Sequence, residues 1–66
     1  MENRWVAVAA DLWELMNGDR CLARVIRFAA DGGNWSICLS DKKGIQGSGF
    51  PSAFAAMVSV RKILGI

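Results

Sequence analysis

The segment 34–40, NWSICLS, constrains the fold more than any other part of this sequence. Trp35, Ile37 and Leu39 fall on one side of it and smaller residues on the other, which is the alternation of a half-buried β-strand. Turn-forming segments bound it on both sides, AADGGN (29–34) before it and DKKG (41–44) after it. The pattern therefore predicts one antiparallel strand between two turns, with Trp35 in the core.

Two further strands are predicted beside it. The segment from Arg20 to Phe28 is rich in strand-forming residues, and IQGSGF (45–50) forms a third strand that its glycines weaken. Because three strands follow one another with short connections, they predict an antiparallel meander.

A helix is predicted after the third strand. Pro51 suits its first position, since the missing N–H would have no partner there. Arg61 and Lys62 lie in the last turn, where cations face the negative end of the helix dipole, and Gly65 closes the helix. Phe54 lies on the flank of an apolar stripe that faces the sheet. The stripe contains Ala53, Ala56, Met57, Val60, Ile63 and Leu64.

The segment before Arg20 has two interpretations. As a helix from about Trp5 to Met16 it has one apolar stripe and many good helix formers, with Asn17-Gly18 as its C-cap. As a hairpin, Asn17-Gly18 forms a type I′ turn between LWELM and DRCLA. We favour the helix. The sequence thus predicts a single α+β domain over residues 1–66, with a three-stranded antiparallel sheet packed by a C-terminal helix and an N-terminal helix (α-β-β-β-α) or hairpin.

Composition narrows the functional classes. The chain has no histidine, and its two cysteines lack the spacing of a zinc site, so we expect no enzyme, no metal and no cofactor. Cys21 and Cys38 are expected to be free thiols, although a disulfide between the two predicted strands stays open. No apolar run reaches the ~20 residues of a membrane span, and Glu2 stands where a signal peptide has basic residues. We expect a cytoplasmic protein without membrane contact.

A protein interface is the leading functional expectation. Trp5 and Trp13 lie apart around an ideal helix, so both cannot centre on one buried stripe. We predict that Trp13, with Phe50 and Phe54 as neighbours, binds another protein. The expected function is a non-enzymatic adaptor or inhibitor, such as a phage-type accessory protein or anti-CRISPR factor that blocks a larger host machine. A homodimer would also cover the apolar surface that so small a chain exposes.

Nucleic-acid binding is the alternative. The net charge is only +2, but Arg20 and Arg24 share strand parity and are expected on one sheet face. Trp35 would offer a stacking platform beside them. The other candidate contacts are Lys42, Lys43, Arg61 and Lys62.

Residues 34 to 64 resemble the carboxy-terminal half of double-stranded-RNA-binding domains. NWSICLSDKKGIQGSGFPSAFAAMV shows that family's order of strand, short turn, glycine-ended strand and alanine-rich helix. The lysine cluster that opens the family's second helix is missing, since no positive charge occurs from Gly44 through Val60. We therefore carry over no RNA-contacting residue.

The chain also resembles the small YegP-like bacterial domains. Like them it has a tryptophan-bearing strand, a glycine and an aromatic residue before the helix, and an ending of the form Ser59-Val60-Arg61-Lys62. That resemblance implies a small sheet and helix. Integrase arm-type DNA-binding domains provide a third analogy, because their three-stranded sheet contacts the major groove.

Overall fold

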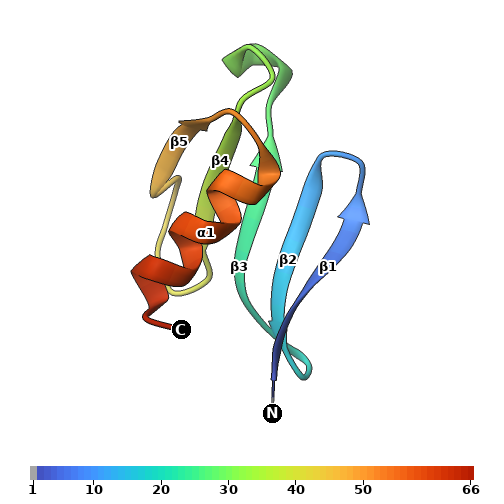
Figure 1. Ribbon diagram of the computed structural model, residues 1–66, viewed down its shortest axis with the longest axis vertical. Helices are drawn as coiled ribbons and strands as arrows, with labels where there is room; N and C mark the ends of the chain where they lie inside the picture. Colours follow the sequence, from blue (N-terminus) through green and yellow to red (C-terminus); the bar gives the residue numbers. More distant parts are fainter. Residues whose placement is uncertain (1) are drawn as a thin grey trace.

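The computed structural model describes residues 2–66 as a five-stranded antiparallel sheet with one α-helix against one of its faces (Figure 1). The strands lie side by side in sequence order, so the sheet is a simple meander. The α+β class is confirmed, whereas the three-stranded sheet and the N-terminal helix are wrong. The elements are β1 (Asn3–Ala9), β2 (Leu12–Asn17), β3 (Arg20–Arg27), the 3₁₀ turn η1 (Ala29–Asp31), β4 (Trp35–Leu39), β5 (Gly47–Phe50) and α1 (Ala53–Leu64).

The segment predicted as a helix, Trp5 to Met16, forms most of the hairpin of β1 and β2 instead. β1 pairs with β2 from Asn3 opposite Asn17 to Ala9 opposite Leu12. Both faces of this hairpin carry apolar side chains, so the two-residue alternation of a strand is hidden in the sequence. Its alanines favour a helix locally, but pairing along β3 outweighs that preference.

The turn between β2 and β3 lies one residue beyond the place that the hairpin interpretation gave it. Asn17 pairs with Arg20, so the loop consists of Gly18 and Asp19. Gly18 has a φ of 61°, whereas Asp19 has no positive φ. A type I′ turn needs a positive φ at both loop positions and a type II′ turn only at the first, so this loop fits type II′ and not type I′. Neither interpretation of the sequence predicted β1 as a strand.

The core lies between α1 and the sheet face that it covers. Trp35, Ile37 and Leu39 of β4 are buried there, as their alternation predicted. They pack with Leu15, Ala23, Val25, Ala56 and Val60. The helix packs on β3, β4 and β5 (Figure 1), so the β1–β2 hairpin extends beyond the area that the helix covers.

The helix α1 begins two residues later than predicted. Ser52 is its N-cap, and its hydroxyl accepts a 3.1 Å hydrogen bond from the backbone N–H of Ala55. Pro51 therefore precedes the cap instead of opening the helix. The predicted C-cap is confirmed, because Gly65 is left-handed and its N–H donates to the Arg61 carbonyl. Ile63 departs from the predicted buried stripe, with 52% of its surface exposed.

Candidate functional site

The sheet face opposite α1 is the surface that the fold leaves open. Directly paired residues of antiparallel strands point to the same face, so the register defines this surface, which we call the open face. No helix among residues 2–66 covers it. Its side chains form three rows across the strands: Val6, Glu14, Arg24 and Cys38; Leu12, Ile26 and Ser36; and Arg4, Met16 and Cys21.

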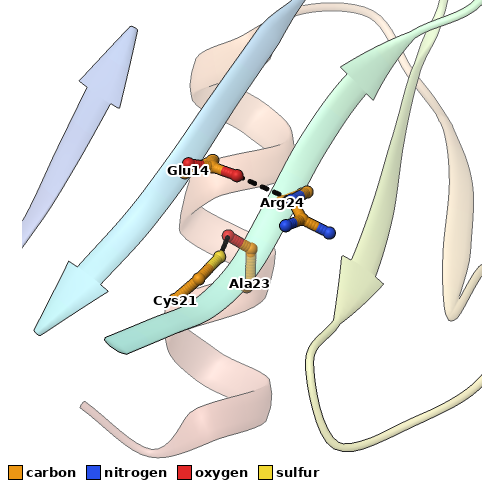
Figure 2. A network of polar contacts seen from close by, with 4 residues as sticks. All are labelled: Glu14, Cys21, Ala23 and Arg24. Atoms are coloured by element: carbon orange, nitrogen blue, oxygen red, sulfur yellow. Dashed lines mark hydrogen bonds and ion pairs between the residues drawn. The ribbon is translucent and has the colours of Figure 1, made fainter. Parts of the chain in front are cut away.

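An ion pair occupies the middle of the open face. Arg24 Nε donates a 2.7 Å hydrogen bond to Glu14 Oε2 across β3 and β2 (Figure 2). This hydrogen bond raises the pKa of Arg24 above its ordinary value. Both side chains reach solvent, so the pair contributes at most about 1 kcal/mol to stability. Its main consequence is electrostatic, because it leaves the centre of the open face without an unpaired cation.

Apolar side chains surround this ion pair. Val6, Leu12, Met16 and Ile26 are half-buried although no second layer covers them. They shield one another, which is how a sheet face with a single layer retains apolar residues at its surface.

A shallow hollow lies on the side of the open face that is formed by β4, β5 and the end of β3. Ser36 is buried there, while Phe28 and Ile45 are 39% and 54% exposed. The hollow has a volume of about 580 Å³. Its lining consists of Phe28, Ala30, Asp31, Ser36, Ile45 and Ser48. An apolar side chain of a partner would meet two hydrophobic walls and a few polar groups there.

The predicted protein interface is distributed differently. Trp13 lies in β2 on the side of the sheet that faces the core, and Phe50 ends β5; both are partly buried against the core. Strands β3 and β4 separate them. Phe54, in the first turn of α1, is 74% exposed. The three residues therefore do not form one continuous patch around Trp13.

Two of the predicted nucleic-acid contacts are corrected by the structure. Leu15 pairs with Ala23 and Met16 with Cys21, so Leu22 is an extra residue in a β-bulge. The bulge reverses the strand parity and places Arg20 on the helix side, whereas Arg24 is on the open face. Trp35 is 8% exposed and belongs to the core, so it offers no stacking platform.

Apart from Arg24, the cations predicted to contact nucleic acid gather at one end of the molecule, together with Arg4. The β2–β3 turn, the β4–β5 loop and the end of α1 all lie at the end where β1 starts (Figure 1). This basic end holds six of the eight basic residues, but only Glu2, Asp19 and Asp41 of the six acidic ones. Its cations are Arg4, Arg20, Lys42, Lys43, Arg61 and Lys62.

Arg27 has a structural role at the opposite end. Its side chain donates to the Asp11 carboxylate in the β1–β2 turn, and its backbone N–H donates to the Asp11 carbonyl. The guanidinium lies over the Trp35 ring, 5.7 Å from the ring centroid. These contacts hold the first hairpin against the core. They also pair the Arg27 cation with groups of the protein itself.

The open face is the surface that the sequence did not identify. A signal was present in ARVIRF (23–28), where Arg24, Ile26 and Phe28 alternate on one side of a strand and mix charge with large apolar residues. Leu12 could not be assigned to this face, because β2 had been predicted as a helix. Ile45 lies in a loop, where periodicity gives no information.

The described residues, 2–66, contain no cluster of three side chains suited to a metal ion. Cys21 and Cys38 are both free thiols. Within the same residues no helix has the length and hydropathy that a membrane span requires.

The fold and surface thus define a class of small α+β meander proteins with one helical layer and one open sheet face. Comparison with known protein families, with curated proteins and with solved structures gave no match for this chain.

Proposed function

We propose that this protein is a small non-enzymatic module that binds another protein through its open face and acts as an adaptor or inhibitor. The observation that carries the proposal is an uncovered sheet face with apolar residues around an internally neutralised ion pair, Glu14 and Arg24. The free energy falls when a protein surface covers an apolar surface with exposed Phe28 and Ile45. The free thiols Cys21 and Cys38 support a reducing compartment such as the cytoplasm.

The expected partner presents an apolar side chain to the hollow between Phe28 and Ile45. A few well-packed aromatic or aliphatic residues usually provide most of the binding energy at such a site. Ser36 lines the hollow, and Glu14 and Arg24 belong to the neighbouring row of the open face. They can therefore exchange hydrogen bonds with polar groups at the rim of the partner.

Affinity capture with matched variants tests this proposal. The tagged protein is immobilised and exposed to bacterial lysate, with and without nuclease, at low and high salt. We expect a discrete protein that survives nuclease and high salt with the wild type and with Ile63→Glu, but is lost with Ile45→Glu. The two isoleucines are 52% and 54% exposed, so the variants differ mainly in the face that they alter.

Other outcomes contradict the proposal. Equal loss with Ile45→Glu and Ile63→Glu would show that the introduced charge, and not the open face, weakens capture. Recovery that disappears with nuclease would assign the binding to nucleic acid.

The concentration of cations at the basic end favours nucleic-acid binding as a second candidate function. Lys42 and Lys43 are exposed in the β4–β5 loop, and Arg61 and Lys62 are exposed at the end of α1. Contacts with phosphate would make such binding weaken steeply as salt rises, whereas binding through the open face would change little.

A further inference from the structure

A cavity lies on the helix side of the sheet, where the end of α1 meets the start of β1. Its volume is about 420 Å³, within the roughly 300 to 1,000 Å³ of pockets that bind small ligands. The helix packs on β3, β4 and β5, so the β1–β2 hairpin lies beside it and not beneath it (Figure 1). The lining of this space, which we call the Trp5 cavity, consists of Glu2, Asn3, Trp5, Leu15, Arg61 and Ile66.

Trp5 gives the cavity an aromatic wall. Trp5 pairs with Leu15, and Leu15 pairs with the buried Ala23, so the Trp5 ring points to the helix side of the sheet. The register of β1 shifts only beyond Ala7, which leaves this pairing regular. Trp5 packs against the core and keeps part of its surface exposed. A tryptophan surface of this kind is a platform on which any nucleobase can stack.

Polar groups lie around this aromatic wall. Asn17 Nδ2 donates a 2.7 Å hydrogen bond to Asn3 Oδ1, which holds the Asn3 amide at the rim. Arg61 is exposed in the last turn of α1, and among residues 2–66 no carboxylate forms an ion pair with it. Its guanidinium can therefore contact an anion.

An aromatic wall beside a guanidinium and an amide matches the chemistry of a nucleotide. A base can stack on Trp5 while its phosphate contacts Arg61. Asn3 and Glu2 can exchange hydrogen bonds with the edge of the base. A peptide carboxylate would also pair with Arg61, but the basic end around the cavity holds six of the eight basic residues, which matches a chain of phosphates better than one carboxylate.

We propose that the Trp5 cavity binds one nucleotide of a single-stranded nucleic acid, with its base stacked on Trp5 and its phosphate on Arg61. The cavity lies on the sheet face opposite to the open face, so this site goes beyond the protein binding proposed there. It rests on the second candidate function and gives that function the stacking surface that the buried Trp35 does not provide.

Titration with oligo(dT) of about eight nucleotides tests this proposal through the ¹H–¹⁵N signals of the three tryptophan indoles. We expect the Trp5 signal, identified by its loss in Trp5→Leu, to shift. The signals of Trp13 and Trp35 should stay in place, because neither residue lines the cavity. Inorganic tripolyphosphate carries negative charge without a base, so it should shift the Trp5 signal much less.

Two pairs of variants separate stacking from charge. Trp5→Leu should raise the dissociation constant about tenfold, because it removes the stacking surface. Phe54→Leu removes a ring that is 74% exposed outside the cavity and should leave the constant unchanged. Arg61→Gln should raise it about fivefold, whereas Arg4→Gln, which removes the same charge on the open face, should change it by less than about twofold.

Far-UV circular dichroism and unchanged Trp13 and Trp35 signals confirm that the variants are folded. A wild-type protein that does not bind the oligonucleotide would overturn both this site and the second candidate function. Binding without a shift of the Trp5 signal, or an equal shift with tripolyphosphate, would overturn the Trp5 cavity alone and assign the binding to other parts of the basic end. Equal effects of Arg61→Gln and Arg4→Gln would overturn the phosphate contact of Arg61.

Discussion

Trp13 and Phe54 show how burial decides the role of a single aromatic residue. Trp13 packs against the core beside Val25, whereas Phe54 is 74% exposed. We predict that Trp13→Ala lowers the free energy of unfolding by about 2 to 3 kcal/mol, because it removes part of the core packing. Phe54→Ala should change it by less than about 0.5 kcal/mol. Urea unfolding followed by circular dichroism measures both values.

The same pair tests the interface that the sequence predicted. Loss of partner capture with Phe54→Ala, in a protein of unchanged stability, would show that Phe54 contacts the partner. Unchanged stability with Trp13→Ala would contradict its assignment to the core and restore it as a surface anchor.

At the scale of elements, α1 depends on its two caps. The Ser52 hydroxyl satisfies one of the N–H groups that the first turn leaves without a helical partner. Ser52→Ala should therefore lower the free energy of unfolding by about 1 kcal/mol, while Ser52→Asp should retain most of it. Thermal unfolding of the three proteins is the measurement. An equal loss with Ser52→Asp would contradict the capping role and assign the effect to local packing.

The elements also show which parts of the fold the sequence can predict. β4 was predicted because its alternation and its flanking turns are local signals, and the end of α1 because Gly65 and the last-turn cations are. β1 and β2 were missed because their stability comes from pairing with β3, which is not local. The bulge at Leu22 likewise follows from the register between strands, so the separation of Arg20 from Arg24 could not be derived.

At the scale of the whole molecule, a single helix packs on a sheet of five strands. A 66-residue chain buries only about 60% of the surface of its unfolded form, and here the helix covers one face of three strands. The remaining exposed apolar side chains are distributed over the open face, with Phe28 and Ile45, and over α1, with Phe54, Val58 and Ile63. The partner proposed above would cover the first of these two groups.

Net charge and the position of charge can be varied separately in this molecule. Lys42→Gln with Lys43→Gln and Ala30→Asp with Val58→Asp both change the net charge from +2 to zero. The first pair removes cations from the basic end, and the second adds carboxylates elsewhere at exposed positions. If the basic end binds phosphates, replacing the two lysines should weaken the affinity for single-stranded DNA by about tenfold. It should also lower the salt dependence of that affinity by the equivalent of about two phosphate contacts. The two aspartate substitutions should have a smaller effect on both quantities. Equal effects in fluorescence anisotropy titrations at two salt concentrations would instead show that the interaction responds to net charge alone.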